Sequence, residues 1–195
     1  MLKLLNQKRS YQENMLIIAM IGMSVLFLIL VLAYSLSKGN KGWLDFQLPK
    51  IFNFSTFVIL ISSYTLHQAN LSFKKDDFVG YRYFLGSTVF LGLTFMVCQV
   101  IGWVHLQEKG LFLIKGKTSV AYLYLLTGLH VIHFLAGMTA LLILTWQALK
   151  KIKYVDSFVY SINPPNQKRL KLVSMFWHFL DGVWLLLYLF FFLNH

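Results

Sequence analysis

Residues 177–184 have the sequence WHFLDGVW and lie inside the last apolar segment of the chain. They place two ionisable side chains, His178 and Asp181, where the neighbouring residues predict a membrane helix. Three positions apart on a helix, these side chains project from one face, with Cβ atoms roughly 5–6 Å apart. Trp177 and Trp184 bracket Asp181 on an overlapping face. An aspartate in the middle of a bilayer costs about 2.5–3.5 kcal/mol, so something must offset that cost.

The composition of the whole chain is that of an integral membrane protein. Of the 195 residues, 57% are hydrophobic and 13% are charged, and the mean hydropathy is +0.63. Soluble domains are about one-quarter charged. The net charge of +11 does not indicate nucleic-acid binding, because the eighteen Lys and Arg residues lie between or at the edges of apolar segments. The single cysteine, Cys98, excludes an intrachain disulfide.

Five apolar segments reach or approach the 20 or so residues that span a bilayer. They cover approximately residues 15–36, 54–73, 83–105, 119–148 and 171–193. The sequence therefore predicts an all-α membrane protein with five transmembrane helices, in one domain over residues 1–195. The fourth segment is long enough to be tilted or to project beyond the membrane. Residues 37–53 and 150–170, the latter with Pro164-Pro165, are predicted to be linkers.

The distribution of basic residues predicts the orientation. The N-terminal tail and the second and fourth connections hold twelve Lys and Arg residues, against six in the first and third connections. Cytoplasmic loops carry the excess of positive charge. The N-terminus is therefore predicted to be cytoplasmic, and His195 to lie on the outer side.

His130, His133 and His178 lie well inside the apolar segments, as does the acid Asp181. His130 and His133 share one helical face of the fourth segment, as His178 and Asp181 do in the fifth. Histidines facing each other from two helices suit haem ligation, whereas polar side chains in membranes also hydrogen-bond neighbouring helices or lipid headgroups. Asp181 suits either a proton relay or transport role or a structural one. The sequence shows no phosphate loop, paired carboxylates or Cys-x-x-Cys-His motif, so independent catalysis is not expected.

The stretch 177–184 resembles the final-helix signature of subunit III of haem–copper oxidases, usually Trp-His-Phe-x-Asp-x-x-Trp. Residues 127–133, followed by Gly137, resemble the Thr-Gly-x-His-x-x-His helix of that family. Residues 53–69, with Ser62-Ser63-Tyr64-Thr65, resemble the second helix of the short bacterial members. Residues 91–95 with Gln99 and Trp103 resemble the third helix. The four stretches occur in the family's order and cover essentially the whole chain.

The resemblance implies a noncatalytic helical bundle with no catalytic or metal-binding residue of its own. Haem and copper are then expected in the partner subunits I and II, and phospholipid in this subunit, within a bacterial inner membrane and a respiratory complex or supercomplex. The family is implicated in stabilising the core subunit and in sustaining proton uptake. By analogy, six residues would bind lipid or form a polar lock between helices: His130, His133, Trp177, His178, Asp181 and Trp184.

Two positions depart from the family pattern. The first helix often has Ser-Glu where this chain has Ser24-Val25, and the third helix often has Gln-x-x-Glu-Trp where Gly102 precedes Trp103. A proton-buffering role of those glutamates is therefore not carried over. Related subunits of quinol oxidases and nitric-oxide reductases share much of the pattern and remain alternatives, as does a stand-alone transporter or a haem-carrying membrane anchor.

Overall fold

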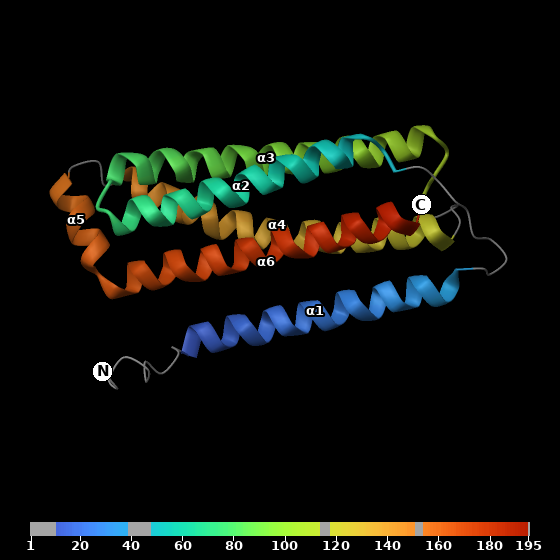
Figure 1. The fold of residues 1–195 in the computed structure, drawn as a ribbon, viewed down its shortest axis with the longest axis horizontal. Helices are drawn as coiled ribbons and strands as arrows, with labels where there is room; N and C mark the ends of the chain where they lie inside the picture. Colours follow the sequence, from blue (N-terminus) through green and yellow to red (C-terminus); the bar gives the residue numbers. More distant parts are fainter. Residues whose placement is uncertain (1–10, 39–47, 114–117, 151–153, 195) are drawn as a thin grey trace.

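The computed structural model describes residues 11–38, 48–113, 118–150 and 154–194, which form helices joined by turns (Figure 1). The helices are α1 (Tyr11–Ser37), α2 (Ile51–Lys74), α3 (Phe78–Glu108), α4 (Thr118–Lys150), α5 (Tyr154–Ile162) and α6 (Pro164–Asn194). The five predicted segments are all helical, and each helix extends beyond its predicted bounds. The prediction of an all-α protein is confirmed.

Four helices, α1, α3, α4 and α6, are long and apolar enough to cross a membrane. Helix α2 has 24 residues, and at 1.5 Å per residue it is about 36 Å long, which exceeds the roughly 30 Å of a hydrocarbon core. Its composition is more polar, because Ser, Thr, His and Asn residues recur along it. Five membrane crossings and a cytoplasmic N-terminus therefore remain predictions.

The predicted linker over residues 150–170 is wrong in part. Helix α5 forms within it, and α6 begins at Pro164, earlier than expected. Proline has no backbone N–H and fixes φ near −65°, so it is tolerated in the first turn, where the N–H groups have no partner inside the helix. Pro164-Pro165 therefore starts α6 instead of marking a loop.

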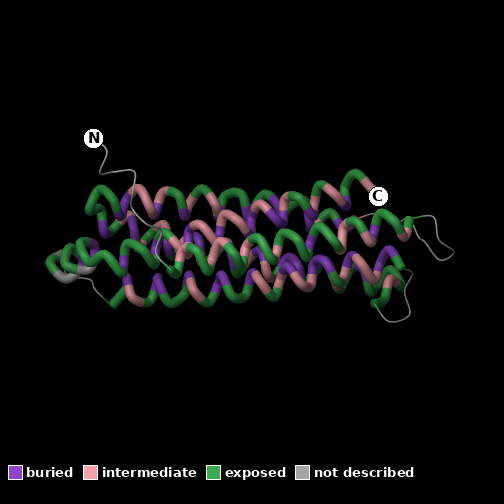
Figure 2. The backbone as a smooth tube through the Cα atoms, turned by 90° about the horizontal axis from the view of Figure 1, so that it is seen from below, coloured by how far each residue is buried: buried purple, intermediate pink, exposed green. Residues whose placement is uncertain are grey.

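Helices α2, α3, α4 and α6 form a ring in which each packs against two others, and α1 packs outside it against α4 and α6 (Figure 1). Buried and exposed residues alternate along the helices (Figure 2). Helix α1 has few buried residues, among them Phe27 and the fully buried Tyr34. The Tyr34 ring meets Tyr122 of α4 and Phe190 of α6, with centroids 5.8 and 5.0 Å apart.

The turn between α2 and α3 and the short helix α5 lie at the same end of the bundle (Figure 1). Arg82 of α3 donates a hydrogen bond of 3.4 Å to Ser157 of α5, and Ser161 Oγ of α5 lies 3.5 Å from a carboxylate oxygen of Asp76 in that turn. The second and fourth connections, both rich in basic residues, are thus joined. Some residues used to predict the orientation lie outside the described residues. They are His195 and the basic residues at positions 3, 8, 9, 41, 115, 117, 151 and 153.

Candidate functional site at the interface of α2 and α6

Helix α6 is held against α2 by five side-chain hydrogen bonds, which define the α2–α6 interface. Trp177 Nε1 donates to Ser62 Oγ at 3.2 Å, and Trp184 Nε1 donates to Thr56 Oγ1 at 3.0 Å. His178 Nδ1 lies 2.7 Å from Ser63 Oγ. The remaining bonds run from Tyr188 to Asn53 and from Asn70 to Ser174. The residue numbers of the bonded partners generally increase along α6 as they decrease along α2, as expected for antiparallel helices.

The sequence places these groups on matching stripes. On α2, Thr56, Ser63 and Asn70 are seven residues apart, which is two helical turns. On α6, a stripe at spacings of three and four runs through positions 174, 177, 181, 184 and 188. In the sequence, the α6 stripe is conspicuous through its tryptophans and its ionisable pair. The seven-residue recurrence of polar groups on α2 is the signal that would have predicted its partner.

Trp184 joins the interface to the centre of the bundle. Its indole ring packs against Phe95 of α3 in an edge-to-face arrangement, with centroids 5.1 Å apart. His130 of α4 lies 5.4 Å from the same ring, and Phe52 of α2 lies 6.0 Å from it. Trp184 is 2% exposed. One side chain thus contacts three neighbouring helices and donates a hydrogen bond to one of them.

The polar lock was expected to join the His178–Asp181 pair to the His130–His133 pair, and no hydrogen bond between the two pairs occurs among the described residues. His178 bonds to α2, and His133 Nδ1 bonds to the carbonyl oxygen of Leu129 in its own helix at 2.9 Å. Both ring nitrogens of the buried His130 and both carboxyl oxygens of the buried Asp181 have no hydrogen-bond partner among the described residues. His130 is surrounded instead by aromatic rings, including those of Phe95 and Phe134.

Residues of the third-helix motif also hold helices together. Gln99 Nε2 of α3 donates to Ser55 Oγ of α2 at 3.2 Å. Trp103 Nε1 donates to Thr127 Oγ1 of α4 at 3.1 Å. Thr127 belongs to the Thr-Gly-x-His-x-x-His stretch, so two of the motifs meet in this bond. Several motif residues on α3, α4 and α6 therefore take part in hydrogen bonds between helices.

The structure accounts for one of the two missing glutamates. A Cβ atom built on Gly102 would collide with the Phe52 ring of α2, so this ring occupies the space that a side chain at position 102 would need. Packing does not explain the second missing glutamate, at position 25. Val25 lies on α1 and is 50% exposed, so a side chain there points out of the bundle.

No group of three or more His, Cys, Asp or Glu side chains capable of holding a metal ion occurs within the described part of the chain. His178, the histidine of the opening stretch, is engaged through Nδ1 with Ser63. The contacts that the structure shows at the α2–α6 interface are ring packing and hydrogen bonds between helices.

Comparisons with known proteins agree with these motifs. Residues 39–194 match the sequence model of a family described as cytochrome c oxidase subunit III. The chain is 24% identical over 180 residues to cytochrome c oxidase subunit 3 of Thermostichus vulcanus, covering 89% of this chain and 82% of the relative. It is 30% identical over 158 residues to cytochrome bo(3) ubiquinol oxidase subunit 3 of Pseudomonas aeruginosa, covering 80% and 69%.

A probable quinol oxidase subunit 3 of Staphylococcus saprophyticus is 29% identical over 143 residues, covering 73% of this chain and 66% of the relative. Relatives named after both electron donors, cytochrome c and quinol, are thus similar to this chain. The family match covers α2 to α6, the helices that form the ring and its interface. With its several apolar helices, the chain is a multi-pass membrane protein and belongs to the subunit III family of haem–copper oxidases.

Proposed function

We propose that this chain is the noncatalytic subunit III of a bacterial respiratory terminal oxidase, a cytochrome c oxidase, in the inner membrane. It stabilises the catalytic core subunit, holds phospholipid and supports proton uptake during oxygen reduction. Haem and copper reside in subunits I and II, its partners in the complex. The cytoplasmic N-terminus and the fifth crossing, by α2, are part of the same proposal.

The α2–α6 interface is the observation that carries the structural role. The residues that resemble the family signature, Trp177, His178 and Trp184, each engage a hydroxyl group of α2 through one ring nitrogen. Indole and imidazole groups used in this way fix the geometry of two helices. A rigid bundle of this kind suits a subunit that supports a neighbour.

Affinity purification of the tagged full-length chain in mild detergent tests the assignment. Haem- and copper-containing subunits are expected to copurify, with the reduced-minus-oxidised haem spectrum of an oxidase. An unrelated tagged multi-pass protein from the same membranes is the control. Recovery of the chain without haem-containing subunits would refute the proposal.

The purified complex also identifies the electron donor. Oxidation of reduced cytochrome c, with no oxidation of quinol, is expected for a cytochrome c oxidase. The opposite preference would assign the chain to the quinol oxidase branch of the family. A Soret band in the isolated chain that His178→Ala abolishes, or solute uptake by liposomes containing this chain alone, would favour the rival classes of haem anchor or transporter.

A further inference from the structure

Helix α1 lies outside the ring and turns one regular stripe of side chains toward it (Figure 1). The stripe consists of buried or half-buried residues at positions 13, 16, 20, 23, 27, 30, 34 and 37. Its alternating spacings of three and four residues are those with which one helix packs along another. Most other side chains of α1 are exposed. The sequence of α1 is therefore suited to contact with the ring along the whole helix.

The two halves of α1 nevertheless differ in how closely they pack. In the C-terminal half, Phe27 and Tyr34 are buried, and the Tyr34 ring packs against aromatic rings of α4 and α6. Lys38 Nζ adds a hydrogen bond of 3.1 Å to Asn194 of α6. Within the described part of the chain, no residue from 11 to 26 belongs to the buried core or packs against it. This N-terminal half is about 24 Å long at 1.5 Å per residue. Apolar packing thus anchors α1 in its C-terminal half only.

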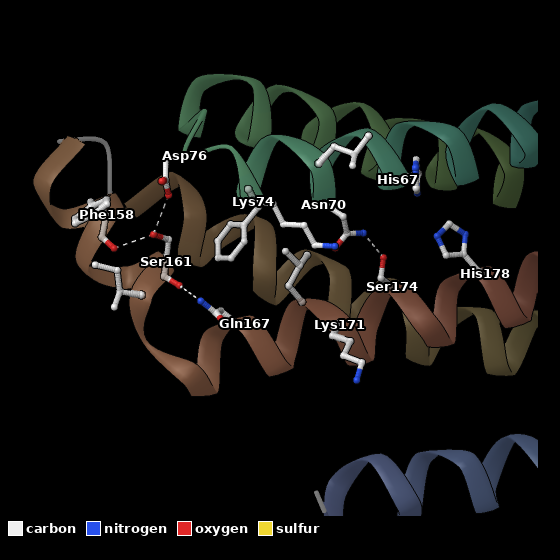
Figure 3. A pocket seen from close by; sticks show the side chains of 14 residues that line it. His67, Asn70, Lys74, Asp76, Phe158, Ser161, Gln167, Lys171, Ser174 and His178 are labelled. Atoms are coloured by element: carbon white, nitrogen blue, oxygen red, sulfur yellow. Dashed lines mark hydrogen bonds between the residues drawn. The ribbon is translucent and has the colours of Figure 1, made fainter. Parts of the chain in front are cut away.

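An ion pair joins the N-terminal end of α1 to α6. Lys171 Nζ lies 3.0 Å from Glu13 Oε1. Lys171 is one of the residues around the pocket between α2, α5 and α6, but its side chain turns away from the pocket and extends toward α1 (Figure 3). The Lys171 side chain is 66% exposed. Because water reaches the lysine, dissolved salt screens this pair, whereas it does not weaken the aromatic contacts of Tyr34.

A cleft of about 330 Å³ lies between α1 and α6, between these two attachments. It is lined by Ser24, Phe27 and Val31 of α1 and by Val183 and Phe190 of α6, among others. The cleft therefore occupies the part of α1 where the closely packed half meets the loosely packed half. Side chains beside such a space lack contact atoms on one side, so little attraction opposes a movement of α1 away from α6 there.

We propose that the Glu13–Lys171 pair is a latch and that α1 pivots about Tyr34. With the latch closed, the N-terminal half of α1 lies along the ring as the structure shows. With the latch open, this half swings away from α6 and the cleft widens toward the bilayer, while the Tyr34 contacts hold the C-terminal half in place. Ionic strength shifts the balance toward the open state, because it screens the latch alone. The inference does not depend on the proposed subunit role.

Distances between spin labels test the pivot in the full-length chain, reconstituted in lipid nanodiscs in a Cys98→Ala background. Labels at Gln12→Cys and Leu149→Cys join the N-terminal end of α1 to the neighbouring end of α4. Labels at Leu36→Cys and Leu193→Cys join the other end of α1 to α6. All four labelled positions are exposed. Double electron–electron resonance gives the distribution of each distance.

Lys171→Gln is expected to raise the population of long distances at the N-terminal pair of labels about two- to fivefold, the factor that corresponds to a partly exposed ion pair. Salt at about 1 M, where the Debye length is about 3 Å, is expected to act in the same direction. Exchange of the two charges, in the double variant Glu13→Lys with Lys171→Glu, is expected to restore the short distance. Lys168→Gln is the matched control, because Lys168 is exposed and lies one turn away on α6.

Unchanged N-terminal distances in Lys171→Gln would overturn the proposal. Equal effects of Lys171→Gln and Lys168→Gln would overturn it as well, since they would show only a general effect of surface charge. Equal broadening at both pairs of labels would rule out the pivot, because the whole helix would then leave the ring. The second pair of labels also confirms that each variant is folded, since its distances are expected to stay the same.

Discussion

His178 Nδ1 of α6 and Ser63 Oγ of α2 are 2.7 Å apart, and this contact joins the histidine of the family signature to the polar stripe of another helix. The two residues are 115 positions apart in the chain. The contact therefore contributes to the packing of two helices that are distant in the sequence. Its contribution to stability can be measured by mutation of the serine alone.

Ser63→Ala is expected to lower the free energy of unfolding by about 0.6 kcal/mol, the average measured for hydrogen bonds between membrane helices, and by no more than about 1.7 kcal/mol, the largest measured value. Unfolding of the detergent-solubilised chain by increasing SDS, followed by circular dichroism, measures the change. Ser24→Ala is the control, because Ser24 is exposed on α1 and donates only to Met20 of its own helix. Equal changes in the two variants would mean that the bond to His178 contributes nothing.

Trp184 and Thr56 are expected to be energetically coupled, since the indole donates to the threonine hydroxyl at 3.0 Å. A double-mutant cycle with Trp184→Phe and Thr56→Val isolates this pair from the loss of aromatic packing. The coupling free energy is expected to be about 0.5–1.5 kcal/mol. If the free-energy changes of the two single variants add to within about 0.3 kcal/mol in the double variant, the bond is not formed in the detergent-solubilised protein.

Gly102→Glu, which inserts the glutamate common in the family, is expected to reduce the folded yield sharply because the Phe52 ring occupies that space. Adding Phe52→Ala to this variant removes the obstruction and is expected to restore part of the yield. Size-exclusion chromatography of the solubilised chain measures both. Val25→Glu is the comparison at an exposed position of α1, where no packing clash is expected. A well-folded Gly102→Glu variant with Phe52 intact would contradict the packing explanation.

Asp181→Asn is expected to change the unfolding free energy of the isolated chain by less than about 1 kcal/mol, because no hydrogen bond with a described residue is lost. Haem content of the assembled complex is expected to stay the same. The readouts are SDS unfolding and the haem-to-protein ratio. A larger loss of stability or a lower haem content would show that Asp181 supports the packing of the bundle, and a reduced proton-pumping ratio in normally assembled complexes would assign it a relay role.

Membrane topology is tested by cysteine labelling in a Cys98→Ala background, which removes the buried native thiol. A membrane-impermeant maleimide is expected to label Lys75→Cys only from the cytoplasmic side and Lys38→Cys only from the outer side. These residues lie beyond opposite ends of α2. Labelling of both from one side would show that α2 does not cross the membrane.

The long helices could be predicted because apolar runs of about 20 residues have few alternatives in a membrane protein. Helix α5 was missed because its nine residues are too short to span a membrane and lie between lysines and Pro164-Pro165, which are typical of a linker. The start of α6 was missed because Pro164-Pro165 occurs equally in loops and in first turns. Local sequence does not distinguish the two cases.

The residues of the α6 stripe were predictable, whereas their partners were not. His178 and Asp181 are polar groups in an apolar run, and the sequence led us to predict that they would contact His130 and His133. The structure pairs His178 with Ser63 and Trp184 with Thr56, small hydroxyl residues that are ordinary in any membrane helix. Which helix faces which depends on the packing of all five long helices, and no local pattern contains that information.

The position of α1 has a consequence for how the protein is made. This helix leaves the ribosome before the other described helices, yet it packs mainly against α4 and α6, which are synthesised later. Until they arrive, α1 must persist in the bilayer as a single span. Of the four candidate spans, α1 has the highest hydropathy and the smallest buried share. Its stability in lipid therefore depends little on contacts with the later helices.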